Sequence, residues 1–271
     1  MYNLAMKITF LGTGSSTPSP KQTGKPFRSY AATLIETGNE SLLFDIGPGS
    51  VQKILSLGID VLKKPTSVFI SHFHLDHCQD IIALMKARAL HHSYTGEKNV
   101  LNIYGPSGLG EFLKQLFSGV EKWNYMGEQL KAFTLMNLKE TMDGIVTENE
   151  TFKVSCVEVK HYNGVAYRLE AEGKSVIYSG DMGYDENLSI LGKNADLAIV
   201  ECSYPDKMTL KGLHLCPEEI ALLATAGKFE QTVLTHMYPA CEGREDEIKK
   251  VIEDNSKTKV TVTEDFFSIN L

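Results

Sequence analysis

Residues 72–77 carry a dense cluster of metal-binding side chains, and this cluster constrains the chain more than any other part of its sequence. They read HFHLDH and directly follow the apolar run SVFIS, which predicts a buried strand. Because extended backbone sends the side chains of residues i and i+2 to the same side, His72 and His74 can converge on one point. Asp76 and His77 lie just beyond, where the chain turns toward a predicted helix. A loop that is rich in histidine by chance is the alternative, but this density directly after a strand favours a metal site.

Three later residues stand in the same setting, each directly after a strand-like run: His161, Asp181 and His236. Taken singly, each could be an ordinary turn residue. Functional residues of sheet proteins gather at the carboxyl ends of strands, however, so these three can meet the first cluster at one edge. Imidazole nitrogen and carboxylate oxygen suit zinc and, less exclusively, manganese or iron. The sequence thus offers enough ligands for two metal ions: His72, His74, Asp76, His77, His161, Asp181 and His236.

Apolar and β-branched runs predict a strand-rich first quarter, followed by mixed strands and helices. The predicted strands are Lys7–Leu11, Ala31–Ile35, Ser41–Phe44, Ser67–Ser71, Val100–Tyr104, Phe152–Val159, Val165–Glu170, Ser175–Tyr178, Leu197–Glu201, Thr232–Thr235 and Val260–Thr263. The predicted helices are Pro48–Leu57, 81–89, 109–117, Pro217–Ala226 and Gly243–Asp254, of which the last is charged and expected to face solvent. This order favours two sheets packed face to face with helices outside, a layered α/β (α+β) architecture. Since no linker or internal repeat is found, residues 1–271 are expected to form a single domain.

The composition restricts the partners and the compartment of the chain. Its net charge of −7 argues against broad, non-specific nucleic-acid binding, although a local basic pocket is compatible with it. No run of about 18 apolar residues exists, so no membrane helix is expected, and the first residues lack the pattern of a signal peptide. Five scattered cysteines without a CxxC pair indicate reduced, mostly buried thiols in a cytoplasmic protein. They are Cys78, Cys156, Cys202, Cys216 and Cys241.

The candidate ligands, taken in order, resemble the pattern of the metallo-β-lactamase superfamily, and the resemblance covers nearly the whole chain. It implies a four-layer αββα sandwich with two metal ions at one edge. The ligands that it implies are His72, His74 and His161 for one ion, Asp76, His77 and His236 for the other, and Asp181 as a bridge. Many β-lactamases of this kind place a cysteine where Asp181 stands, and flavodiiron-type oxidoreductases commonly place a glutamate where His74 stands. Both of these activities are therefore disfavoured.

Finer features are similar to the ribonuclease Z and phosphodiesterase branch of this superfamily. The opening FLGTGSSTP at residues 10–18, the segment DLAIVEC at 196–202 and the segment HLCPEE at 214–219 carry this similarity. In that branch, a histidine at the position of His214, helped by an acid at the position of Glu201, assists the leaving group. The alternative for His214 is an ordinary residue at the start of a helix.

One departure from ribonuclease Z affects the expected substrate. Those enzymes usually carry a long protruding arm that grips tRNA. Here the chain runs from His161 to Asp181, and from there to His214, with little spare length. Together with the negative net charge, this favours a smaller phosphodiester, and RNA is kept only as a disfavoured partner.

We therefore expect a metal-dependent hydrolase, above all a phosphodiesterase that acts on a small phosphodiester or nucleotide-type substrate through a metal-bridging hydroxide. Asp76 would hold one metal and orient the nucleophile, His214 would protonate the leaving oxygen, and Glu201 would orient His214. The implied cofactors are two divalent ions, zinc before manganese or iron. The alternatives are a thioesterase or lactonase on the same fold, a ribonuclease Z-like tRNA 3′ endonuclease, and a metal-stabilised binding protein without turnover. The resemblance also implies a homodimer.

Two further segments have both a functional and a structural interpretation. Residues 18–29 place three cations, among them Arg28, between glycines and prolines. These cations could meet a phosphate, but a solvated loop is favoured. Residues 123–126 hold two aromatic side chains and a methionine, which could line a pocket or simply pack in the core.

Overall fold

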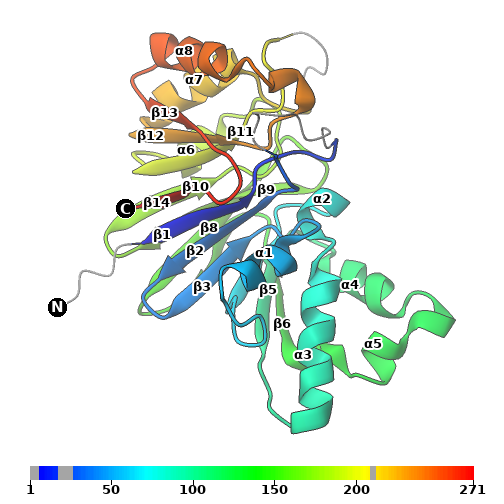
Figure 1. Cartoon of the computed structure of the whole chain (residues 1–271). Coiled ribbons are helices and arrows are strands. Elements are labelled where there is room, and N and C mark those ends of the chain that lie inside the picture. Colours follow the sequence, from blue (N-terminus) through cyan, green and yellow to red (C-terminus); the bar gives the residue numbers. More distant parts are fainter. Residues whose placement is uncertain (1–5, 18–26, 208–211) are drawn as a thin grey trace.

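Two β-sheets pack face to face, and helices cover both of their outer sides (Figure 1). The computed structural model describes residues 6–17, 27–207 and 212–271. The first sheet runs in the order β14 (Ser268–Asn270), β1 (Lys7–Gly12), β2 (Ala32–Thr37), β3 (Glu40–Phe44), β4 (Ser67–Phe69), β5 (Leu101–Gly105) and β6 (Met136–Glu140). The second runs in the order β13 (Lys259–Val262), β12 (Gln231–Thr235), β11 (Leu197–Glu201), β10 (Lys174–Tyr178), β9 (Gly164–Ala171), β8 (Phe152–Val159) and β7 (Gly144–Glu148). The predicted αββα sandwich is confirmed.

The helices lie between the strands in the sequence and outside the sheets in space (Figure 1). The α-helices are α1 (Ser50–Ser56), α2 (Leu75–Cys78), α3 (Ile81–Thr95), α4 (Leu109–Ser118), α5 (Tyr125–Glu128), α6 (Asn187–Leu191), α7 (Pro217–Gly227) and α8 (Glu245–Asn255). Short 3-10 turns are η1 (Glu121–Trp123), η2 (Ala132–Leu135) and η3 (Pro239–Cys241). The five helices predicted from the sequence correspond to α1, α3, α4, α7 and α8.

The strand directions bring the carboxyl ends of several strands to one edge. β10, β11, β12 and β13 are parallel to one another. β9 is antiparallel to both β8 and β10, so β8 runs in the same direction as β10. In the first sheet, β3, β4, β5 and β6 are parallel. Segments that follow β8, β10, β11 and β12 therefore leave the second sheet at the same edge.

Successive side chains of a strand point to opposite faces of the sheet, and this alternation divides the apolar side chains between three cores. In β3, Leu42 and Phe44 lie between the sheets, whereas Leu43 faces the helices. The core between the sheets is rich in aromatic rings. Phe69 stacks on Phe44 with ring centroids 4.8 Å apart, and it meets Tyr167 of the other sheet edge-on at 5.6 Å. The outer cores lie under α1, α3 and α4 on one side and under α6, α7 and α8 on the other.

Most of the elements that the sequence did not predict are edge strands or single turns. β6 and β7 each form one edge of their sheet, and in β6 only Met136 is buried. β14 has three residues and α2 has four. Exposed edges carry polar side chains and very short elements show no period, so neither gives a hydrophobic pattern to read.

The last helix, α8, was expected to face solvent, and this expectation is wrong for one of its faces. Ile248 and Ile252 are fully buried in the outer core of the second sheet. They are four residues apart and lie on the same side of the helix, while charged residues cover the other sides. The charged composition of this segment concealed a narrow apolar stripe.

All five cysteines are buried free thiols, as the sequence predicted. Burial raises the pKa of Cys78 and of Cys156 to about 12, so both thiols stay protonated at neutral pH. Among the helices of the described residues, none combines the length and the apolar character that crossing a membrane requires.

The two segments with open interpretations are described in part. Residues 18–26, which carry two of the three cations, lie outside the described residues. Arg28 donates to the Thr13 hydroxyl at 3.1 Å and to a backbone carbonyl, so the protein itself holds its guanidinium group. Tyr125 and Met126 pack in the outer core of the first sheet, which supports the structural interpretation of that segment.

We predict that Phe69→Ala lowers the free energy of unfolding by about 3–5 kcal/mol, because it leaves a cavity among the stacked rings between the sheets. Urea unfolding followed by circular dichroism measures the change. Leu222→Ala is the control, since Leu222 is 55% exposed on α7 and its truncation should change stability by less than about 0.5 kcal/mol. Equal stability losses in the two variants would contradict the central position of Phe69.

Candidate metal centre

The side chains predicted as metal ligands lie together at one edge of the sandwich. They come from α2 and from residues that follow β4, β8, β10 and β12. Their ligand atoms form two groups, and within each group all the atoms lie within 4.8 Å of one another. The first group is His72, His74, His161 and Asp181, and the second is Asp76, His77, His236 and Asp181. The structure thus brings together every residue of the predicted set, and their assignment as ligands stays a prediction.

The segment at residues 72–77 supplies ligands to both groups. His74 has extended backbone, with φ −64° and ψ 142°, and stands directly before α2. Its ring centroid lies 4.5 Å from that of His72, as the i, i+2 spacing predicted. The single turn of α2 then places Asp76 and His77, both buried, on the second group.

Asp181 lies at the centre of the cluster, where the two groups meet. Its Oδ1 atom is 3.2 Å from Nε2 of His77 and 3.3 Å from Nε2 of His236. Its Oδ2 atom is 3.8 Å from Nε2 of His72. The preceding residue, Gly180, has a φ of 58°, and a Cβ there would lie 2.6 Å from a serine Cβ of the facing sheet. Glycine is therefore needed for β10 to deliver Asp181 to this point.

Two buried atoms of the cluster have no hydrogen-bond partner among the described residues: Nε2 of His72 and Oδ1 of Asp181. The side chain of His72 is fully buried, and that of Asp181 is 3% exposed. Buried polar atoms without a partner cost free energy, so this arrangement needs a cation or proton between them. A set of imidazoles and carboxylates suits zinc, manganese or iron. These residues fit divalent metal ions.

The ionisation of the cluster also fits cation binding. Burial opposes the charge on Asp181, but the neighbouring His236 and His77 outweigh it and hold the pKa of Asp181 well below its usual range. Burial also opposes the charge on His77, but the carboxylates of Asp181 and Asp45 outweigh it and raise its pKa. Burial, helped by His77, lowers the pKa of His72. These directions favour an ionised Asp181, a neutral His72 and a protonated His77, and a metal ion bound by His77 would displace a proton.

Hydrogen bonds on the far side of the histidine rings hold them in place. Nδ1 of His236 lies 3.1 Å from the hydroxyl of Ser203. Nδ1 of His161 lies 3.2 Å from the carbonyl oxygen of Leu213. Because Nδ1 is engaged in each ring, Nε2 is left to face the cluster.

Asp45 is a residue of this site that the sequence analysis missed. Its Oδ2 atom lies 2.6 Å from Nδ1 of His77 and accepts a hydrogen bond of 2.8 Å from the Tyr178 hydroxyl. Its two oxygens also accept from the backbone N–H and the hydroxyl of Ser71, at 2.7 and 2.8 Å. Asp45 directly follows β3 and therefore stands in the same setting as Asp181, a signal that could have identified it.

His214 and Glu201 form a hydrogen-bonded pair beside the cluster. Nδ1 of His214 lies 3.0 Å from Oε1 of Glu201 and 3.9 Å from Oδ2 of Asp181. Glu201 also accepts from the backbone N–H groups of Met182 and Leu215, so its carboxylate is fixed. Burial opposes the charge on His214, but the hydrogen bond with Glu201 outweighs it and raises the pKa. The pair that the sequence predicted is thus close enough to act on a group bound at Asp181.

Comparison with known proteins identifies the family. Residues 40–237 match the family described as the beta-lactamase superfamily domain, and this range contains every candidate ligand from His72 to His236. The chain belongs to this family. The prediction from the ligand pattern is confirmed.

Several relatives match this β-lactamase superfamily chain over almost its full length. It is 27% identical to a ribonuclease Z of Methanosarcina acetivorans over 98% of each chain. Among solved structures, the metallo-β-lactamase fold protein YhfI from Bacillus subtilis superposes with a TM-score of 0.80 at 22% identity, over 98% of this chain and 100% of the other. A diphosphatase from the PhnP family superposes with a TM-score of 0.73 at 16% identity, over 98% of both. These structural matches establish the metallo-β-lactamase fold.

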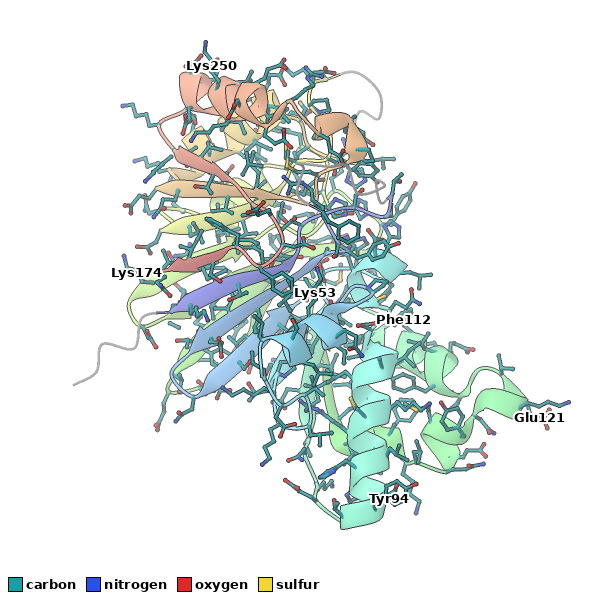
Figure 2. The ribbon with its side chains drawn as sticks, in the orientation of Figure 1. Lys53, Tyr94, Phe112, Glu121, Lys174 and Lys250 are labelled. Atoms are coloured by element: carbon teal, nitrogen blue, oxygen red, sulfur yellow. The ribbon has the colours of Figure 1, made fainter. Side chains whose placement is uncertain are left out.

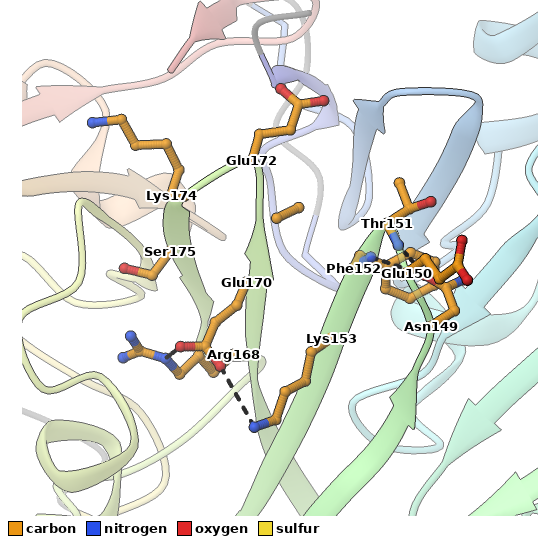
Figure 3. A pocket seen from close by; sticks show the side chains of 12 residues that line it. Asn149, Glu150, Thr151, Phe152, Lys153, Arg168, Glu170, Glu172, Lys174 and Ser175 are labelled. Atoms are coloured by element: carbon orange, nitrogen blue, oxygen red, sulfur yellow. Dashed lines mark hydrogen bonds and ion pairs between the residues drawn. The ribbon is translucent and has the colours of Figure 1, made fainter.

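A hollow of about 460 Å³ lies at the other end of the strands that carry the site (Figure 3). The starts of β8 and β10 and the end of β9 line it, whereas the metal cluster follows the ends of β8 and β10. The hollow is therefore separate from the candidate metal centre. Two of its cations, Arg168 and Lys153, are already paired, since they lie 3.2 and 4.0 Å from the carboxylate of Glu170.

We predict that Asp45→Asn weakens zinc binding by about 10- to 100-fold, the usual effect of removing a hydrogen-bond partner from a metal-binding histidine. Both carboxylate oxygens of Asp45 accept hydrogen bonds, so the amide nitrogen of asparagine would face a donor in either orientation. Competition with a chelating dye measures the affinity. Asp196→Asn is the control, because Asp196 accepts from Ser175 at the start of β10, away from the cluster. Unchanged affinity in Asp45→Asn would rule out this role.

Proposed function

We propose that the chain is a metal-dependent hydrolase that cleaves a small phosphodiester or nucleotide-type substrate. The observation that carries this proposal is the position of His214, a potential proton donor. Glu201 holds its Nδ1 atom, which lies 3.9 Å from Oδ2 of Asp181, the residue that both ligand groups share. Structural metal sites are closed and have no use for a proton donor, whereas catalytic sites keep an open position. This arrangement therefore supports turnover.

The two groups around Asp181 support a division of the candidate ligands between two ions. His72, His74 and His161 would hold one ion, Asp76, His77 and His236 would hold the other, and Asp181 would contact both. Zinc is the first choice for imidazole and carboxylate ligands, and manganese and iron are the alternatives. When bound, divalent ions of this kind supply a hydroxide nucleophile at neutral pH and positive charge against the phosphate oxygens.

The chain's own residues orient the reactants and move a proton. Asp76, which is 7% exposed and lies 3.4 Å from His236, would orient the nucleophile. Glu201 binds Nδ1 of His214, which leaves Nε2 free to give its proton to the leaving oxygen. Since Glu201 also raises the pKa of His214, the donor is protonated at a higher pH than a free imidazole would be.

Short connections between the strands that lead to His161 and Asp181 favour a small substrate over tRNA. β8 and β9 are joined by residues 160–163, and β9 and β10 by residues 172–173. The alignment with the ribonuclease Z of Methanosarcina acetivorans runs over 321 positions, whereas this chain has 271 residues. At least 50 aligned positions are therefore absent from this chain, which supports the loss of a tRNA-gripping arm. The net charge of −7 supports the same conclusion.

Two other hydrolase activities are kept as second candidates. The name of the Methanosarcina acetivorans relative favours a ribonuclease Z-like tRNA 3′ endonuclease. A thioesterase or lactonase would use the same ligands on a carbonyl centre.

We also propose that residues 1–271 form a single cytoplasmic domain that assembles as a homodimer.

We predict that zinc-loaded protein hydrolyses bis(p-nitrophenyl) phosphate and that chelation abolishes this activity. Rates on this diester, on thioester and lactone panels, and on a precursor tRNA separate the candidates. A higher kcat/KM on thioesters or lactones, or accurate tRNA 3′ cleavage, would overturn the small-phosphodiester proposal. Bound metal without turnover of any of these substrates would indicate a metal-stabilised binding protein.

We predict that His214→Ala lowers kcat by about 10²- to 10⁴-fold on diesters with alkoxide leaving groups, because these need a proton, while metal content is retained. Asp181→Ala should lose metal and activity together. Elemental analysis and steady-state kinetics on both variants measure the difference. Equal metal loss in the two variants would contradict the separate roles of His214 and Asp181.

A further inference from the structure

Two tyrosines form a stacked pair next to the proton donor. Tyr204 and Tyr238 have ring centroids 5.6 Å apart and an interplanar angle of 23°. Each lies three residues past the end of a strand, and the parallel register of β11 and β12 sets Glu201 opposite Thr235. The register therefore brings the two rings together. Both side chains stay partly exposed, so the stack can accept another ring.

The tyrosine pair lies on the side of the site where the leaving group would depart. The ring of His214 meets Tyr204 edge-on at 5.8 Å and Tyr238 at 5.5 Å. Tyr238 also lies 5.8 Å from the candidate ligand His236. A leaving oxygen that takes its proton from His214 would thus carry the rest of the leaving group toward these two rings.

The hydroxyl groups of the two tyrosines have few hydrogen-bond partners among the described residues. That of Tyr204 has no partner among the described residues, and that of Tyr238 has only a 3.5 Å contact with the Ser16 hydroxyl. Because the Tyr204 hydroxyl is buried while the residue is partly exposed, Tyr204 offers a ligand the face of its ring. Aromatic side chains beside a phosphate-binding site characteristically stack on nucleobases, whatever the base.

We propose that Tyr204 and Tyr238 form a subsite for an aromatic leaving group and that this group is a nucleoside. The inference rests on the proposed phosphodiesterase function. In the reaction, the oxygen of water bonds to phosphorus, and the bond from phosphorus to the nucleoside oxygen breaks with its electron pair on that oxygen. His214 gives the nucleoside oxygen a proton and regains one from solvent. The products are a nucleoside and a phosphate monoester.

The methyl ester of adenosine 5′-phosphate tests this subsite, because it can be cleaved in two ways. Cleavage on the nucleoside side gives adenosine and methyl phosphate, and cleavage on the methyl side gives adenosine 5′-phosphate and methanol. We expect the zinc-loaded wild-type protein to favour adenosine release by about tenfold or more, the size expected for one base–aromatic stack. Both leaving groups are alcohols that need the proton, so a disturbed His214 would slow both routes and leave their ratio unchanged.

Matched variants separate ring stacking from other roles of the tyrosines. Tyr204→Leu and Tyr238→Leu remove one ring each and should bring the product ratio toward one. Tyr204→Phe and Tyr238→Phe keep the rings and should keep the wild-type ratio. Tyr94→Leu is the remote control, since Tyr94 is 82% exposed at the far end of α3 (Figure 2).

Binding of adenosine, followed by saturation-transfer NMR, gives a readout that does not depend on turnover. Wild-type protein and the phenylalanine variants should bind adenosine but not ribose, and the leucine variants should lose this binding. Predominant methanol release, or a product ratio and adenosine binding unchanged in both leucine variants, would overturn the subsite while leaving the phosphodiesterase function intact. Failure of zinc-loaded protein to hydrolyse any phosphodiester, bis(p-nitrophenyl) phosphate included, would overturn the phosphodiesterase function and the leaving-group assignment together.

Discussion

A buried carboxylate surrounded by imidazoles is the interaction on which the rest of the site depends. Asp181 is 3% exposed, and its oxygens lie between 3.2 and 3.8 Å from the Nε2 atoms of three histidines. Burial of an ionised carboxylate is costly unless positive charge compensates it. The fold meets this requirement by ending several strands at the same edge, so that the segments after them bring side chains to Asp181. The sandwich architecture and the chemistry of the site are thus parts of one arrangement.

Around that centre, the surroundings change from charged side chains to aromatic rings. The outer ring nitrogens are hydrogen-bonded to neighbouring groups, among them the Ser203 hydroxyl and the accepting Asp45 carboxylate, and this fixes the imidazoles. Glu201 fixes His214 at the rim. Beyond the rim, the stacked tyrosines present apolar ring faces to whatever leaves the site. Charge is concentrated at the centre and aromatic surface at the exit, which suits a substrate with an anionic middle and a flat, uncharged end.

The ligand cluster could be predicted from the sequence because each ligand directly follows a strand or belongs to the HFHLDH segment. The αββα sandwich could be predicted as well, from the order of apolar runs and from the family resemblance. Asp45 also directly follows a strand, so its position was a usable signal, but no local pattern links it to His77, which lies 32 residues away in the sequence. The proximity of Tyr204 and Tyr238 was not foreseeable either, since it depends on the register between β11 and β12. Local sequence patterns indicate which residues follow a strand, whereas the pairing between strands decides which of these residues come into contact.

The division of the ligands between the two sheets has a mechanical consequence. His72 follows β4 of the first sheet, whereas Asp181 and His236 follow β10 and β12 of the second. An ion held by both halves would be a cross-link that exists only when the halves are docked. Its binding free energy would therefore add to the cohesion of the sandwich. Metal supply in the cell would then govern how long the folded chain survives as well as how fast it works.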